Sequence, residues 1–144
     1  MTRVVPQNDR ENGMNFYTRR LVRPEDLNAN NTLFGGRLLE WIDEEAAIYA
    51  IIQLGSPRIV TKYISEISFE SPARTGDLIE LGFIATHFGN SSLTMRATVR
   101  HVISRTQILS IDRIVFVHVD ENGRPAPHGY STITYNRDRH PVAV

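Results

Sequence analysis

The sequence predicts an α+β domain in which one long helix packs against an antiparallel sheet of five to six strands. The helix is indicated by a stretch of about 20 positions, from Gly35 to Leu54, that lacks proline and contains several alanines. The sheet is indicated by the chain after Arg58, where runs rich in Ile, Val, Phe and Thr are separated by short polar turns. Short connections between successive strands favour antiparallel pairing.

The elements are expected in the order strand, helix and then four strands. A first strand is expected from Phe16 to Val22, and Gly55 and Pro57 end the long helix. The strongest strand prediction is Leu93 to Arg100, because the residues LTMRATVR alternate strictly between apolar and polar. The other expected strands are Ile59 to Phe69, Leu78 to Phe88 and Thr106 to Val119.

Composition predicts one globular domain over residues 14–130, because 144 residues are enough to bury a single core. Residues 1–13 are expected to form a flexible N-terminal segment. Residues 131–144 contain charge, proline and few core-forming side chains. They are therefore expected to form a C-terminal tail, either free or docked as an arm on a neighbouring subunit.

The charge balance and the absence of cysteine exclude several classes of function. Sixteen basic residues balance sixteen acidic ones, so no net field draws the protein to nucleic acid or to a membrane surface. The chain has no cysteine, which excludes disulfides, thiolate zinc sites and a cysteine nucleophile. No apolar run approaches the roughly 18 residues of a membrane span, and the first residues lack a secretory signal. A cytoplasmic protein is expected.

Common catalytic and cofactor motifs are absent. The sequence has no G-x-S-x-G elbow, no phosphate-binding glycine loop and no H-E-x-x-H pair, so no metal and no cofactor are expected. The histidines are scattered and are expected to be surface or packing residues: His87, His101, His118, His128 and His140.

The expected helix carries an aspartate outside its polar sector. At about 100° per residue, Arg37, Glu40 and Glu44 share one narrow face, whereas Asp43 lies among mainly small residues. A buried carboxylate loses hydration worth several kcal/mol unless it is paired. Asp43 is therefore either functional, hydrogen-bonded to a nearby strand or a partner subunit, or exposed by rotation of the helix. Glu45 also lies off the polar sector and is interpreted as a paired or snorkelling residue.

A Gly-Gly pair at the start of this helix suggests a second functional group. The first N–H groups of a helix have no intrahelical partner, and Gly35 and Gly36 would allow an oxyanion or a polarised carbonyl to approach them. Asp43 lies about two turns further on, or roughly 10 Å along the axis. The N–H donors at the start of the helix and the Asp43 carboxylate are therefore too far apart for both to act on one small carbonyl group. A site formed by two subunits could supply the missing donor or carboxylate.

Three stretches of the sequence resemble one known family. RPEDLNANNTLFGGRLLEWIDEEAA (Arg23 to Ala47) resembles the signature of hotdog-fold acyl-CoA thioesterases, in particular the broad-range bacterial and the brain-type acyl-CoA hydrolases. ISFESPARTGDLIEL (Ile67 to Leu81) and GNSSLTMRATV (Gly89 to Val99) resemble the later strands of that family. The likeness extends from about residue 16 to residue 119. It implies a hotdog fold, in which an antiparallel sheet wraps a long central helix.

The resemblance also implies catalytic residues. The catalytic aspartate of the family corresponds to Asp43, acting as a general base on water or as a nucleophile on the thioester. The asparagine of the brain-type enzymes corresponds to Asn28, which would come from the other subunit. The backbone N–H near Gly36 would polarise the carbonyl group, with Phe34 and Gly35 beside the substrate.

Substrate binding and assembly are implied in the same way. The coenzyme A moiety of an acyl-CoA substrate is expected near Arg74 and near the turn that contains Asn90, Ser91 and Ser92. A homodimer with shared sites is expected, with a hexamer built as a trimer of dimers as a further possibility. The alternative function is a non-catalytic hotdog domain that binds acyl-CoA as a sensor. A hotdog dehydratase fits less well, because the expected helix contains no histidine.

Overall fold

The long helix is present at the expected residues. In the computed structural model, which describes residues 10–11, 13–136 and 138–139, helix α1 spans Gly35–Leu54. It ends at Gly55, whose φ of 61° lies in the left-handed region that glycine adopts without steric cost. A short 3-10 helix, η2 (Pro24–Asp26), precedes α1 in the loop after the first long strand.

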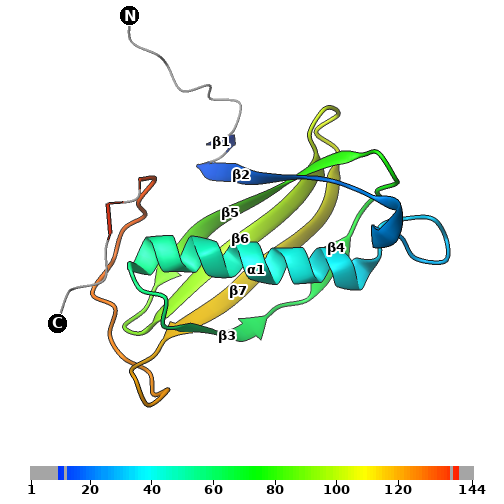
Figure 1. The fold of residues 1–144 in the computed structure, drawn as a ribbon. Coiled ribbons are helices and arrows are strands. Elements are labelled where there is room, and N and C mark those ends of the chain that lie inside the picture. Colours follow the sequence, from blue (N-terminus) through cyan, green and yellow to red (C-terminus); the bar gives the residue numbers. More distant parts are fainter. Residues whose placement is uncertain (1–9, 12, 137, 140–144) are drawn as a thin grey trace, which may run out of the picture.

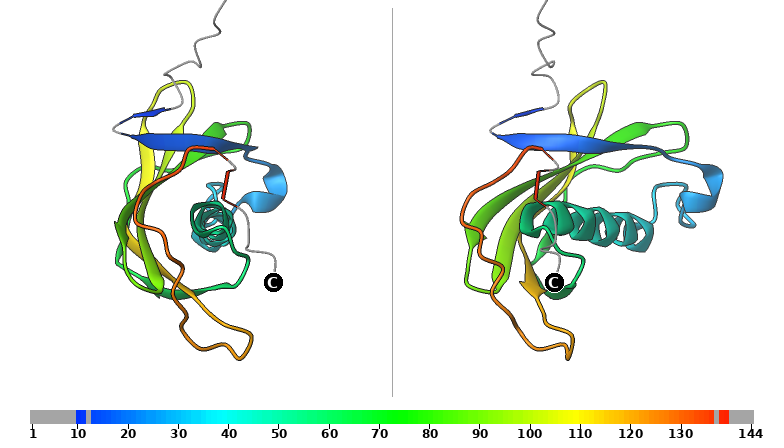
Figure 2. Two further views of the ribbon diagram at one scale, coloured as in Figure 1. Left: turned by 90° about the vertical axis from the view of Figure 1, so that its left-hand side faces the viewer. Right: turned by 60° about the vertical axis from the view of Figure 1, so that its left-hand side comes forward.

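The strands form one antiparallel sheet that curves around α1 (Figures 1 and 2). Six strands follow one another in the order β1-β2-β5-β6-β7-β3, and β4 pairs with β7 outside this path. This arrangement confirms the predicted hotdog fold. The strands are β1 (Arg10–Glu11), β2 (Met14–Leu21), β3 (Ile59–Ile64), β4 (Ile67–Phe69), β5 (Leu78–Phe88), β6 (Ser92–His101) and β7 (Gln107–His118).

One predicted strand is divided in two. The expected strand at residues 59–69 forms β3 and β4, which pair with β7 on either side of Ser65. The Ser65 N–H donates to the Arg113 carbonyl oxygen at 2.8 Å, and the Ser65 hydroxyl accepts the Arg113 N–H at 3.1 Å. A side-chain hydroxyl thus replaces one ladder contact, and sequence periodicity does not reveal such a substitution.

The core lies between α1 and the concave face of the sheet. The alternation predicted for β6 is confirmed, because Leu93, Met95, Ala97 and Val99 are all fully buried. On the helix side, the Tyr49 hydroxyl accepts the backbone N–H of Ala85 at 2.9 Å. Burial raises the pKa of Tyr49 to about 12, so this residue is protonated at neutral pH.

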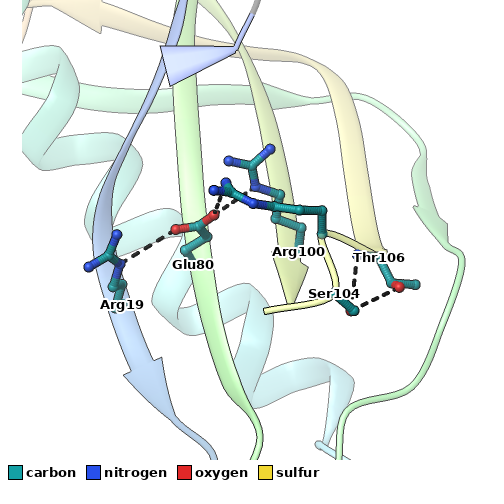
Figure 3. A network of polar contacts seen from close by, with 6 residues as sticks. Arg19, Glu80, Arg100, Ser104 and Thr106 are labelled. Atoms are coloured by element: carbon teal, nitrogen blue, oxygen red, sulfur yellow. Dashed lines mark hydrogen bonds and ion pairs between the residues drawn. The ribbon is translucent and has the colours of Figure 1, made fainter. Parts of the chain in front are cut away.

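The convex face of the sheet carries a buried ion-pair cluster (Figure 3). Glu80 is 1% exposed and lies between Arg19 and Arg100, its direct neighbours across β2 and β6. Its carboxylate contacts the Nε atoms of Arg100 at 2.7 Å and of Arg19 at 3.5 Å, and Arg105 at 3.2 Å. The Arg100 guanidinium also lies 3.7 Å from the ring centroid of Phe16. The cluster fixes the register of β2, β5 and β6.

The C-terminal segment docks on its own chain. Gln53, on α1, is 1% exposed and exchanges two hydrogen bonds with the backbone of Thr134, at 2.7 and 2.9 Å. Arg139 donates to the Gln53 carbonyl oxygen at 2.7 Å. This docked part of the predicted tail covers the C-terminal end of α1 (Figure 2). Most of the predicted N-terminal segment, residues 1–9 and 12, lies outside the described residues, as do residue 137 and residues 140–144.

The helix is less buried than its sequence suggests. Ile48 is 44% exposed, and Asp43 is also exposed in the single chain. Exposure of Asp43 to solvent was one of the alternatives that the sequence left open. Both side chains are exposed because the sheet wraps only one side of α1, and the remaining sides are open.

Candidate active site

Asp43 lies on the side of α1 that faces strand β3. Its Oδ1 accepts a hydrogen bond from the Thr61 hydroxyl at 3.0 Å, and Thr61 is on β3. This contact agrees with one of the interpretations left open by the sequence, a hydrogen bond to a nearby strand. An exposed carboxylate whose second oxygen is directed away from this bond is suited to accept a proton or to attack an electrophile.

Glu45 has a different environment, although it is only two residues away. Its Oε2 accepts the Thr18 hydroxyl at 2.6 Å, and its Oε1 lies 3.5 Å from Arg20, both on β2. Glu45 is therefore paired, as the sequence suggested. Two residues correspond to about 200° around a helix, so Asp43 and Glu45 point to opposite sides. Of these two carboxylates, only Asp43 is directed toward the β3 side.

The start of α1 has the glycine geometry that close approach requires. A Cβ atom on Gly36 would lie 2.5 Å from the ring of Phe34, so only glycine is accommodated there with this ring position. A Cβ atom on Gly35 would lie 3.3 Å from the ring of Phe69, on β4. No side chain caps the helix, so its first N–H groups stay available to a ligand. Phe34 and Phe69 are 54% and 57% exposed, and they frame this terminus with apolar surface.

Asn28 lies in the loop before the helix, and its side chain organises that loop. Its Oδ1 accepts the N–H groups of Asn30 at 2.9 Å and Thr32 at 3.2 Å, and its Nδ2 donates to the Thr32 hydroxyl at 3.1 Å. Asn31, between these residues, has a φ of 61°. Asn28 therefore has a structural role in addition to any catalytic one, and the side-chain oxygen carries most of it.

The loop is held against the helix by Asp26. The Asp26 carbonyl oxygen accepts the Phe34 N–H at 2.9 Å, and its carboxylate lies 3.6 Å from the Nε of Arg37. The Leu33 N–H donates to the Ala73 carbonyl oxygen at 2.7 Å, which joins the loop to the turn before β5. Asn28 is therefore fixed near the N-terminal end of α1, whereas Asp43 is about 12 Å along the axis from Gly35.

The edge of the sheet beside Asp43 is open and apolar. Strand β3 ends the six-strand path of the sheet, so its outer N–H and C=O groups are unpaired within the described chain. Large apolar side chains are exposed along β3 and β4: Val60, Tyr63, Ile64 and Phe69. Several exposed apolar side chains at an open sheet edge are typical of a surface that another chain covers.

The residues expected to bind coenzyme A do not meet within one subunit. Arg74 lies in the turn before β5, whereas Asn90, Ser91 and Ser92 lie at the hairpin after it (Figure 1). An 11-residue strand separates them by roughly 35 Å. Arg74 is exposed, and its backbone N–H donates to Asp77 Oδ2 at 2.8 Å. The two groups can serve one ligand only if they come from different subunits.

Two residues of this region were missed by the sequence analysis. Thr61 is a hydroxyl residue in an exposed strand, and no periodicity links it to a helix residue 18 positions earlier. Phe69 ends a short strand, and its contact with Gly35 depends on the division of β3 from β4. Within the described ranges, no cluster of His, Asp or Glu could hold a metal ion. No helix in the part of the chain that is described is long and apolar enough to cross a membrane.

Comparison with protein families identifies one match. Residues 30–107 match the family described as the thioesterase superfamily. A relative named "Uncharacterized acyl-CoA thioester hydrolase YkhA", from Bacillus subtilis (strain 168), is 32% identical over 109 residues. The alignment covers 74% of this chain and 63% of the relative, so the chain spans less than two thirds of that protein.

Solved structures show the same fold. A structure described as an apo-hexameric acyl-CoA thioesterase is 36% identical, with a TM-score of 0.69 over 76% of this chain and 72% of the other. An acyl-CoA hydrolase from Staphylococcus aureus, solved with butyryl coenzyme A and coenzyme A, is 30% identical, with a TM-score of 0.68 over 76% of this chain and 66% of its own. That enzyme has also been solved with an aspartate, an asparagine or a threonine replaced by alanine.

The geometry of the Asn28 loop yields a prediction about two substitutions. In Asn28→Ala, the amide of Thr32 should exchange its hydrogen about fivefold faster, because one hydrogen bond worth ~1 kcal/mol is lost. Asn28→Asp keeps the accepting oxygen and should retain the protection. Amide exchange followed by NMR measures both. Equal protection of Thr32 in wild type and Asn28→Ala would contradict the structural role of Asn28.

Proposed function

The chain belongs to the thioesterase superfamily, and from this premise we propose that it is an acyl-CoA thioesterase. It hydrolyses the thioester of an acyl-CoA to a fatty acid and free coenzyme A. The family match, together with relatives and solved structures described as acyl-CoA hydrolases, supports this activity. The alternative of a non-catalytic acyl-CoA sensor is not favoured, because similar proteins are described as hydrolases and Asp43 is an exposed carboxylate oriented by Thr61.

The observation that supports this mechanism best is the environment of Asp43. As a general base, Asp43 takes a proton from water, the hydroxide adds to the thioester carbon, and the C–S bond breaks to release the thiolate of coenzyme A. As a nucleophile, the carboxylate itself adds to that carbon, the C–S bond breaks to release the thiolate of coenzyme A, and water then hydrolyses the resulting mixed anhydride. In both cases the Thr61 hydroxyl fixes the orientation of the carboxylate through Oδ1. The other oxygen is left for the reaction.

The start of α1 stabilises the oxyanion. The carbonyl oxygen of the thioester accepts the N–H of Gly36, where the helix dipole favours the negative charge that develops on it. With the Phe34 ring in its present position, a Cβ atom at residue 36 would lie 2.5 Å from that ring, so a larger residue there would have to displace Phe34. Phe34 and Phe69 provide apolar contacts for the substrate beside this group.

Each active site is formed by two subunits. Asn28 of one subunit orients the water or the thioester at Asp43 of the other. The open β3 edge and its exposed apolar side chains support a dimer formed along this edge. Such a dimer also brings Arg74 of one subunit and the Asn90–Ser92 turn of the other to one coenzyme A. A trimer of dimers is consistent with the similar enzyme described as hexameric.

The absence of cysteine supports a cytoplasmic location.

The role of Asp43 is tested by Asp43→Asn. This substitution should lower kcat by at least about 100-fold, because a positioned acid–base group contributes that much, and coenzyme A binding should be largely retained. Steady-state kinetics with acetyl-, butyryl-, hexanoyl- and palmitoyl-CoA measure the loss. Glu45→Gln is the matched control and should change stability more than rate, because Glu45 is paired with Thr18 and Arg20. Near-normal turnover in Asp43→Asn would exclude the catalytic role.

The hydrogen bond from Thr61 is tested by two replacements. Thr61→Val removes the donor and should lower kcat about tenfold with little change in KM, because only the orientation of Asp43 is affected. Thr61→Ser keeps the hydroxyl and should retain most of the rate. If Thr61→Val keeps the wild-type kcat and Thr61→Ser lowers it, packing of the Thr61 methyl group matters and the hydrogen bond does not.

A further inference from the structure

A cavity at the end of β2 is lined by three arginines and two carboxylates, together with Leu21 and Trp41. It has a volume of about 320 Å³ and is lined by residues of the end of β2, the 3-10 helix η2 and α1. Three of its lining residues are arginines from one short stretch of chain: Arg19, Arg20 and Arg23.

Arg20 is held in a fixed position. Its guanidinium lies 4.9 Å from the ring centroid of Trp41, which also lines the cavity, and 3.5 Å from Glu45 Oε1. Its Nε is buried and has no hydrogen-bond partner among the residues that the structure describes. A guanidinium ordered in this way loses little entropy when it binds a ligand, and its planar donor groups match the oxygens of a phosphate.

Arg23 provides a second cation at the mouth of the cavity. Its side chain is 69% exposed, and its nearest carboxylate, Glu25, is 4.0 Å away and itself exposed. The other acidic residue of the lining, Asp26, is already engaged by Arg37 and by the backbone N–H of Arg23. Arg19 contacts Glu80 on the convex face. The two cations directed toward the cavity are therefore Arg20 and Arg23.

The cavity adjoins two segments already assigned to the substrate. Asp26 is two residues before Asn28, so the loop that carries Asn28 begins at the cavity wall. On the other side, Val22 forms two backbone hydrogen bonds, both of 2.9 Å, with Gly76 and Asp77 in the turn that contains Arg74. Arg20, Arg23 and Arg74 are thus gathered at one end of the molecule, although the chain as a whole is neutral.

We propose that this cavity binds the phosphate groups of the acyl-CoA substrate, with Arg20 and Arg23 as the ligands for the phosphate oxygens. The inference rests on the proposed function, because it assumes that acyl-CoA is the substrate. Acyl-CoA carries its phosphates far from the thioester, so these arginines contribute to binding and not to bond cleavage. A neutral protein attracts such an anion through local cations, and the interaction weakens as salt screens it.

The test compares two substrates that differ in their phosphates. Wild type and Arg23→Gln are assayed with an acyl-CoA that wild type hydrolyses and with the matching S-acyl pantetheine, which carries no phosphate. The ratio of kcat/KM for acyl-CoA to kcat/KM for acyl-pantetheine should fall about tenfold in Arg23→Gln, through KM. Arg23→Lys should recover part of the loss. Raising the salt concentration should lower the ratio more in wild type than in Arg23→Gln.

The control is a variant of an arginine that lies outside the cavity. Arg124→Gln removes an exposed arginine in the turn after β7 and should leave the ratio at the wild-type value. An unchanged ratio in folded Arg23→Gln would overturn the inference while leaving the proposed function intact. Binding of inorganic phosphate can be measured by calorimetry. If this binding depends on Arg23 but the ratio of kcat/KM values is unchanged in Arg23→Gln, the inference is also overturned, because the cavity then binds an ion that is unrelated to the substrate. If wild type hydrolyses neither substrate, the proposed function fails, and the inference fails with it.

Discussion

The rotation of α1 within the curved sheet determines where each of its polar groups lies. Trp41, Ile42, Ala46, Tyr49 and Ala50 are buried against the concave face, and this packing leaves the helix no freedom to turn. Asp43 is consequently directed to β3, where Thr61 orients it. Glu45 is directed to β2, where Thr18 donates a hydrogen bond to it and Arg20 forms an ion pair with it. Turning α1 about its axis by about 100°, the angle between successive residues, would exchange polar and apolar positions on the sides that face β3 and β2. The difference between the carboxylate proposed to react and the structural one thus follows from core packing.

A single subunit nevertheless presents an incomplete site. The uncapped helix terminus and Asp43 are separated by about 10 Å along one axis, and Asn28 is tied into its own loop at the N-terminal end. The apolar β3 edge lies beside Asp43, so the same surface that would join two subunits also borders the reacting group. Dimerisation and catalysis are therefore coupled in the proposed mechanism. In the proposed binding mode, the arginine cavity takes the phosphate end of the substrate.

The sequence predicted the fold well because its signals are local. The helix bounds and the alternation of β6 depend on propensity and on side-chain period, and the structure has both. Contacts between distant segments were not accessible in this way. The Thr61–Asp43 bond joins residues on different elements, the division at Ser65 depends on a side-chain hydroxyl, and Gln53 is buried only because Thr134 satisfies its amide. Arg20 and Arg23 gave no signal, since arginines at a strand end are usually solvated.

The central claim, that one site takes Asn28 and Asp43 from different subunits, is tested most directly by mixing two inactive variants. Asn28→Asp is the suitable partner for Asp43→Asn, because the aspartate retains the oxygen that holds the loop. After joint unfolding and refolding, about half of the dimers are mixed, and each mixed dimer has one site with both native residues. A shared site predicts recovery of roughly a quarter of wild-type activity. Confirmed mixed dimers without any recovered activity would show that both residues act within one subunit, which contradicts the shared site.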